Sequence, residues 1–366
     1  MIRPRLSDAE FFYAQDKKKP LKDYLSQLSH IVYHNKLGSQ SERSERVKTI
    51  ASLIVKNLNQ SKLLDAVMLA SDLSKADLSS NMVGEFPELQ GIMGRYYALN
   101  EKISDEVAFA IEDHYKPRFS GDSLPRSTVG DIVAIADKIE TLIGLFSIGE
   151  KPTGDKDPFA LRRQVIGIIR ILTEKNIGLN LNTVISESIQ ATKLVESKDL
   201  NSFIYDRLSN FFKDQGYAAL DIEAVLAIES GLINEIPPRL NAIKEFLLLS
   251  ESEDLASANK RVGNILKKAD VKSTLKVDQS LLKDDAEINL YKTLDLVDAE
   301  SRKEYAAKNY SGSLKLLCKL KNPIDQFFKD VMVNAEDESL KMNRLALLEK
   351  LYSAMNLVAD LSKLSS

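Results

Sequence analysis

Residues 74–98 read SKADLSSNMVGEFPELQGIMGRYYA, and this stretch indicates how the chain folds. Its apolar residues recur at three- and four-residue steps, as on one face of a helix, at Met82, Phe86, Leu89 and Met93. Pro87, Gly91 and Gly94 oppose an unbroken helix, so the pattern predicts a helix, a kink and a second helix. The stretch therefore predicts a buried helical segment whose few polar groups need partners.

The composition points to a helical protein. The 366 residues include only 15 Gly and 10 Pro and no Trp, and strong helix formers are abundant, so we predict an all-α fold of two or three domains. The single cysteine, Cys318, rules out an intrachain disulfide and fits a reducing, cytoplasmic location. No apolar run is long enough to span a bilayer, so we expect no membrane partner. The net charge of −3 argues against non-specific binding to DNA, although a local basic face is compatible with it.

Several motifs are more specific than the periodicity. EFPELQGIMG at 85–94 and GDKDPFALRR at 154–163, together with DHYKPRF and VAIADKIETLIGLF between them, resemble the β subunit of bacterial glycyl-tRNA synthetase. The resemblance extends from RPRLSDAEFF at the start to VADLSKL at the end. Because RPRLSDAEFF lies mid-chain in that family, the resemblance implies that this sequence is the C-terminal half and that Met1 is a truncated start.

The resemblance also implies an activity and partners. In that family a two-α, two-β heterotetramer attaches glycine to tRNA-Gly, with glycine, ATP and magnesium bound by the α subunit and the tRNA held mainly by the β subunit. We therefore expect this chain to be part of a glycine–tRNA ligase, to be non-catalytic by itself and to carry no cofactor. Its expected partners are the α subunit and tRNA-Gly. The sequence shows no Gly-rich loop ending in Lys-Ser/Thr that would cradle ATP.

A second pattern resembles helical metal-dependent phosphohydrolases of the HD type, which use a first His, a His-Asp pair and a distant Asp. KADL places Ala76 where the histidine of the pair would stand and retains Asp77, while VAIADKIETL supplies Asp137 as the distant aspartate. A divalent transition metal would lack its usual nitrogen-rich ligands here. We therefore predict an HD-like helical body without a metal or hydrolase chemistry. A metal site at His30 and His34, four residues apart, would need further ligands.

Two arginines follow an expected helix start. Asp157 before Pro158 predicts a helix from 158 to 173. The arginines at the end of GDKDPFALRR then lie in its first turn, where the helix dipole disfavours cations. Their placement suggests a partner, either a carboxylate of the 85–94 motif or a phosphate of the tRNA acceptor arm. The candidate acceptor-arm or structural residues are Arg162, Arg163, Glu85 and Glu88.

Residues 255–366 differ in charge from the whole chain, with 19 Lys and Arg against 16 Asp and Glu. Within them, ANKRVGNILKKA predicts a helix with a basic, amide-bearing face that suits phosphate and base-edge contacts, although a merely solvated face gives the same pattern. IDQFFKDVMV and MNRLALLEKLYSAMNLVADL resemble the helical anticodon-binding domain shared with arginyl-tRNA synthetase. The candidate tRNA-binding residues are Lys260, Arg261, Asn264, Lys267, Asn343 and Arg344.

These patterns predict a domain plan and leave three functions open. The plan is a lead-in at 1–19 from a missing upstream region, an HD-like domain at 20–240 with connector helices at 175–240, a linker at 241–254 and an anticodon-binding domain at 255–366. The chain could recognise the anticodon and acceptor arm of tRNA-Gly, be a degenerate HD-type phosphohydrolase, or be a purely structural helical scaffold. Ala76 counts against the second, and the wording of the motifs favours the first.

Overall fold

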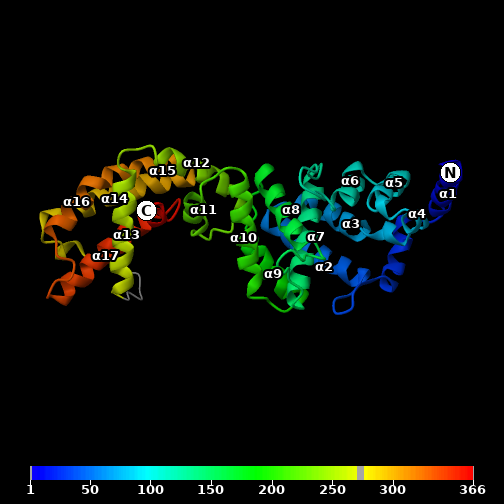
Figure 1. The fold of residues 1–366 in the computed structure, drawn as a ribbon, viewed down its shortest axis with the longest axis horizontal. Coiled ribbons are helices and arrows are strands. Elements are labelled where there is room, and N and C mark those ends of the chain that lie inside the picture. The colour runs from blue at the N-terminus through cyan, green and yellow to red at the C-terminus, as the bar shows by residue number, and fades with distance from the viewer. Residues whose placement is uncertain (1, 270–275, 366) are drawn as a thin grey trace. The chain divides into compact units, whose positions relative to one another are not determined.

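Helices dominate the chain, of which the computed structural model describes residues 2–269 and 276–365 (Figure 1). Within these ranges the strands are limited to β1 (Val32–His34) and β2 (Gly38–Ser39), which pair antiparallel. The all-α fold predicted from the composition is confirmed. No helix in the described ranges is both long and apolar enough to cross a membrane.

The chain divides into two compact units. Unit 1 comprises Met1–Leu208 and Gly231–Asn234, and unit 2 comprises Ser209–Ser230 and Glu235–Ser366. The division falls within α10 (Asp199–Asp214), whereas the expected linker at 241–254 lies inside unit 2. That segment holds the end of α12 (Ile236–Phe246) and the start of α13 (Ser252–Lys268). It is not a free linker, because α12 packs against α15 (Tyr310–Leu316) and buries its apolar side chains.

Unit 1 is organised around α7 (Thr128–Ser147), which is buried from Val129 to Phe146. A helix surrounded on every side by protein marks the centre of a core. The Ser127 hydroxyl begins α7 by accepting a hydrogen bond from the N–H of Gly130 at 3.1 Å. The helices that pack most extensively against α7 are α2 (Gln40–Asn57), α3 (Leu64–Leu73), α6 (Asp105–Asp113) and α8 (Leu161–Glu174). The other elements of unit 1 include α1 (Ile2–Asp16), α9 (Leu181–Thr192) and 3-10 helices at Leu21–His30, Ser61–Leu63 and Ala76–Ser79.

The opening stretch of the sequence has the predicted helix, kink and helix. These are α4 (Asn81–Glu85), a 3-10 turn at Pro87–Leu89 and α5 (Ile92–Asn100). Gly91 has a φ of 80°, and a Cβ on Gly94 would lie only 2.6 Å from Cγ2 of Ile111. The two glycines are therefore required where the chain turns and passes close to a buried wall.

The N-terminal segment is attached to unit 1 by a buried carboxylate. Asp16, at the end of α1, accepts hydrogen bonds from the Tyr97 hydroxyl at 2.8 Å and the N–H of Met82 at 2.9 Å. It also accepts one from the Tyr24 hydroxyl at 3.3 Å. The expected lead-in at 1–19 is thus tied through Asp16 to the stretch that contains α4 and α5.

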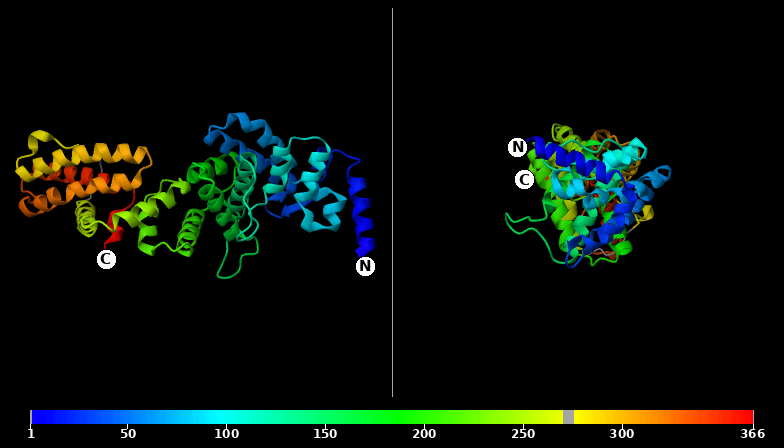
Figure 2. Two further views of the ribbon diagram at one scale, coloured as in Figure 1. Left: turned by 90° about the horizontal axis from the view of Figure 1, so that it is seen from above. Right: turned by 90° about the vertical axis from the view of Figure 1, so that its right-hand side faces the viewer.

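Unit 2 is a bundle whose longest helix, α14 (Asp285–Ala306), lies beside α15, α16 (Lys321–Asp330) and α17 (Glu338–Met355) (Figure 2). Its core includes Leu290, Leu294, Phe327 and Leu347. The turn at Leu361–Leu364 returns the chain to α13 and to α11 (Ala219–Leu226). The remaining short 3-10 helices are Ile233–Glu235, Gln279–Leu281 and Leu317–Leu320.

Candidate nucleic-acid interface and a buried charged centre

The side chains predicted to bind tRNA on α13 are exposed. Lys260, Arg261, Asn264 and Lys267 all face solvent. The Lys260 ammonium donates a long hydrogen bond, 3.4 Å, to the carbonyl oxygen of Ser365. An exposed ammonium or guanidinium group can exchange its water for a phosphate.

Arg261 stacks on an aromatic side chain of the neighbouring helix. Its guanidinium carbon lies 3.9 Å from the centroid of the Phe328 ring, which is half-buried on α16. The pair borders a hollow of about 420 Å³ between α13 and α16. The hollow is also lined by Asp254, Ser257, Ala258, Ile324, Asp325 and Lys329. A planar cation above an aromatic ring, next to an open hollow, is an arrangement on which an unpaired base can stack.

Asn343 and Arg344 are not part of this surface, because both are buried in α17. The Asn343 amide accepts from the N–H of Asp278 at 2.7 Å and donates to its carbonyl oxygen at 3.0 Å. Arg344, 7% exposed, donates to Glu287, to Asp284 at 2.7 Å and to the carbonyl oxygen of Met332 at 2.7 Å. Both residues are therefore buried with polar groups engaged inside unit 2, and neither side chain lies on the surface that a tRNA would contact.

One of the two arginines of GDKDPFALRR, Arg162, has a local partner. Helix α8 begins at Leu161, three residues later than predicted, and the Asp157 carboxylate accepts the N–H groups of Leu161 and Arg162 at 2.8 and 3.0 Å. The Arg162 guanidinium donates to the carbonyl oxygen of Gly154, while Arg163 is exposed.

The predicted carboxylate partners of these arginines face solvent instead. Glu85 and Glu88 are both exposed. Among the ion pairs of the described residues, none joins Glu85 or Glu88 to either arginine of the 154–163 motif. The predicted salt bridge is therefore absent from this structure, and Arg163 is left available to an external anion.

The HD-like positions converge on a buried cluster of charges in unit 1. Asp137, on α7, accepts from Arg43 at 3.1 Å and from Lys75 at 3.0 Å. Arg43 also donates to Glu140 at 3.0 Å. Burial alone would raise the pKa of Asp137, but Arg43 and Lys75 hold it well below its usual value. Burial lowers the pKa of Lys75 to about 8, against the attraction of Asp137.

Asp77, at another HD-like position, accepts its hydrogen bonds from the backbone and not from those cations. Its Oδ2 accepts from the N–H of Gly91 at 2.6 Å and of Gly94 at 2.9 Å, and its Oδ1 has no hydrogen-bond partner in the part of the chain that the structure describes. Burial raises the pKa of Asp77 to about 6, although the two backbone donors oppose the shift. Ala76, where the pattern would have histidine, is buried. His30 ends a 3-10 helix and His34 lies in β1, so these two do not share a helical face.

Comparisons with known proteins decide the family. Residues 1–227 match the family described as glycyl-tRNA synthetase beta subunit, and residues 255–361 match the DALR anticodon binding domain. The chain belongs to the glycyl-tRNA synthetase beta subunit family.

The relatives are close in sequence and about twice as long. The whole chain is 54% identical to a glycine–tRNA ligase beta subunit from Methylobacillus flagellatus and covers 52% of its length. It is 50% identical to the one from Delftia acidovorans, again covering 52%, and 48% identical to the one from Nitrosomonas europaea, covering 54%. The chain therefore spans about half the length of these relatives.

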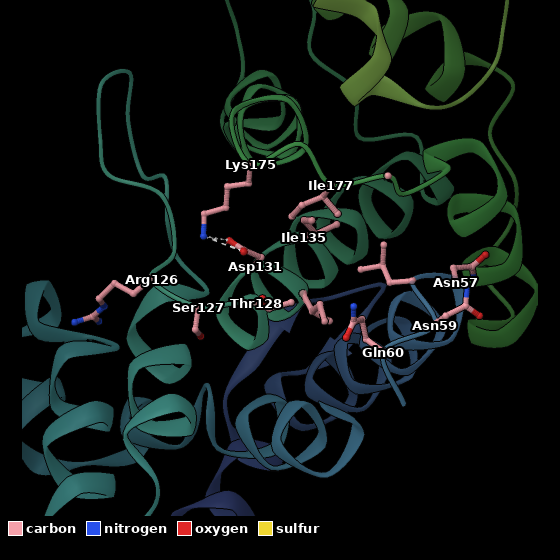
Figure 3. Close-up of a pocket in the computed structure, with 13 residues that line it drawn as sticks. Asn57, Asn59, Gln60, Arg126, Ser127, Thr128, Asp131, Ile135, Lys175 and Ile177 are labelled. Carbon is pink, nitrogen blue, oxygen red and sulfur yellow. Dashed lines mark hydrogen bonds and ion pairs between the residues drawn. The ribbon is translucent and has the colours of Figure 1, made fainter. Parts of the chain in front are cut away.

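Residues within the segment that matches the beta-subunit family line a second, larger hollow in unit 1 (Figure 3). It measures about 630 Å³ and lies between the end of α2, the start of α7 and the segment after α8. Lys175 reaches across one side to Asp131, 2.8 Å away, and amide side chains line another side (Figure 3). The amide-bearing residues are Asn57, Asn59 and Gln60. A concave site with an apolar floor and several polar groups has the form of a ligand pocket.

The sequence did not predict several residues of the buried charged cluster around Asp137 in unit 1. Arg43, Lys75 and His114 were not assigned to it, because charged residues are usually solvated and only their three-dimensional position shows otherwise. A partial signal exists for Arg43: it lies on α2 four residues before buried Val47, so it shares the inward face. The position of Phe328 beside Arg261 could not be known from spacing.

Proposed function

We propose that this chain is the tRNA-binding part of a glycine–tRNA ligase beta subunit. The observation that carries the proposal is the exposed, basic and amide-bearing face of α13, which lies in the segment matching an anticodon-binding domain. The contacting residues in this proposal are Lys260, Arg261, Asn264 and Lys267, with a base of the anticodon stacking near Arg261 and Phe328. Asn343 and Arg344 are left out, because their polar groups are engaged inside unit 2.

The proposal extends to the partners and the chemistry. Glycine, ATP and magnesium would bind a separate α subunit in a two-α, two-β assembly in the cytoplasm, and this chain would carry no cofactor. Unit 1 would lie near the acceptor arm, with exposed Arg163 as a candidate phosphate contact. The purified chain, without α subunit, should therefore give no glycine-dependent ATP–pyrophosphate exchange, and a measurable exchange rate would contradict this assignment.

Binding of native and anticodon-swapped tRNA-Gly tests the RNA-binding role. Lys260→Ala should weaken both RNAs similarly, because phosphates carry no sequence, whereas Asn264→Ala should weaken the native tRNA more if its amide reads a base edge. Lys292→Ala is the matched control, because this exposed lysine lies on α14 of the same unit. If both α13 variants bind both RNAs as the parent does, the chain is better described as a structural helical scaffold.

A further inference from the structure

Lys75 places its ammonium group inside the buried centre of unit 1. The residue is 2% exposed. Its Nζ lies 2.7 Å from Nε2 of His114 and 3.0 Å from Oδ1 of Asp137, and the centroid of the Tyr115 ring is 4.1 Å away. An imidazole nitrogen, a carboxylate oxygen and an aromatic face therefore surround one cation.

The hydrogen bonds of His114 show which of its nitrogens is the acceptor. Nδ1 lies 2.6 Å from the carbonyl oxygen of Ile111, which can only accept, so Nδ1 carries the proton. Burial, together with the neighbouring Lys75, holds the pKa of His114 well below its usual value and keeps the ring neutral. Nε2 then presents its lone pair to the Lys75 ammonium, as it would to a metal ion.

Apart from Oδ1 of Asp77, which has no hydrogen-bond partner among the described residues, the other groups that a metal ion would need are already engaged. Asp137 is shared with the Arg43 guanidinium, and Oδ2 of Asp77 accepts two backbone N–H groups. Lys138, also buried, brings a further ammonium 3.3 Å from the carbonyl oxygen of His114. A divalent ion here would be repelled by these fixed cations.

The side chains that could act as metal ligands also argue against a divalent ion at this place. In the ranges that the structure describes, no three His, Cys, Asp or Glu side chains are arranged to hold a metal. Ala76 stands where the histidine of the pair would be, and His114, which lies in the cluster but follows that pair in the sequence, already accepts from Lys75. The residues present therefore do not fit the metal centre of an HD-type phosphohydrolase.

We propose that the Lys75 ammonium is a covalently attached substitute for the divalent metal ion of an HD-type centre. It supplies the positive charge between the imidazole of His114 and the carboxylate of Asp137. It thereby connects three segments, namely the turn before Ala76, the end of α6 and the middle of α7. The inference concerns unit 1 and stands independently of tRNA binding.

Nitrogen-15 NMR of the histidine rings tests this arrangement in the full 366-residue chain. The chain has 3 histidines, so the His114 signals can be assigned by replacing His30 and His34. The parent should show the Nδ1–H tautomer, with Nε2 shifted as a hydrogen-bond acceptor. Lys75→Met keeps the apolar stem and should return the Nε2 signal to its unbonded position. Lys138→Met is the matched control and should leave it in place, because that ammonium donates to carbonyl oxygens.

A metal challenge gives a second readout that needs no variant to fold. After dialysis against Zn²⁺ or Mn²⁺ and removal of free metal, elemental analysis of the parent should find well below one metal per chain. Stoichiometric metal that is lost in His114→Ala or Asp137→Asn would overturn the proposal. So would an Nε2–H tautomer in the parent, or His114 signals that are the same in Lys75→Met and the parent.

Discussion

Lys75 in unit 1 and Lys260 in unit 2 show the same side chain in opposite surroundings. Lys75 is 2% exposed and surrounded by fixed partners, whereas Lys260 is solvated and, among the described residues, makes only a long hydrogen bond to a backbone carbonyl. Removing a charge from water costs several kcal/mol unless partners replace the water. An exposed cation can instead exchange its water and counterions for a phosphate. Burial, rather than residue type, thus separates the cations that hold the fold from those available to RNA.

Unit 2 contains the same contrast within itself. Arg344 is enclosed by Glu287, Asp284 and a backbone carbonyl, while Arg261 lies on the surface against the Phe328 ring. The sequence predicted that Arg344 and Arg261 both contact tRNA. The contrast predicts that changes at buried charges alter stability and changes on α13 alter binding, and four measurements can sharpen or break it.

The largest effect is expected for Asp137→Ala. Removing this carboxylate leaves the Lys75 ammonium without its carboxylate partner and takes from Arg43 one of the two carboxylates with which it pairs. Breaking a buried pair in this way costs about 3–5 kcal/mol. Urea unfolding followed by circular dichroism measures the loss. Glu88→Ala, which removes an exposed carboxylate, is the control and should change the free energy of unfolding by less than about 0.5 kcal/mol. Equal effects of the two changes would contradict the importance of the buried centre.

Arg344→Ala should be nearly as disruptive, at about 3 kcal/mol or more, because it leaves buried Glu287 without its partner. Under conditions in which the variant is still folded, its affinity for tRNA-Gly should equal that of the parent. Thermal unfolding and filter binding on the same samples separate the two quantities. Reduced affinity at unchanged stability would restore Arg344 to the RNA-contacting set.

Asp77 gives a smaller effect that depends on pH. Its folded pKa, about 6, lies above the ordinary 3.8, so the unfolded chain ionises first as the pH rises. The contribution of Asp77 to stability is therefore complete below pH 3.8 and is lost as the pH rises to about 6. Asp77→Asn cannot ionise, so its stability relative to the parent should improve over this range by on the order of 2–3 kcal/mol. Urea titrations at pH 4, 5, 6 and 7 measure the difference, and a constant difference would show that Asp77 keeps an ordinary pKa.

The sequence predicted the features that depend on local pattern. The helix, kink and helix around Pro87, the all-α fold and the exposed face of α13 each follow from spacing or composition, and each is present. It did not predict which charges are buried, because the partners of Arg344 are 57 and 60 residues away and those of Arg43 are 94 and 97 away. The division inside α10 differs from the linker predicted at 241–254, and a continuous helix carries no boundary signal in its sequence.

The smallest effect on stability, and the sharpest on binding, is expected at Arg261. Its stacking on Phe328 is exposed and is worth about 0.5–1 kcal/mol, so Arg261→Ala should barely change the unfolding midpoint. If the guanidinium contacts one phosphate, its loss should make the slope of log affinity against log salt shallower by about 0.7–0.9 for every tRNA. Arg261→Lys keeps the charge and should restore the slope, but it removes the planar group on which a base could stack. The loss of affinity that remains in Arg261→Lys should therefore be greater for native tRNA-Gly than for an anticodon-swapped form. Titrations of both RNAs at several salt concentrations distinguish the two contributions. An unchanged slope in Arg261→Ala would place the RNA elsewhere and remove α13 from the interface.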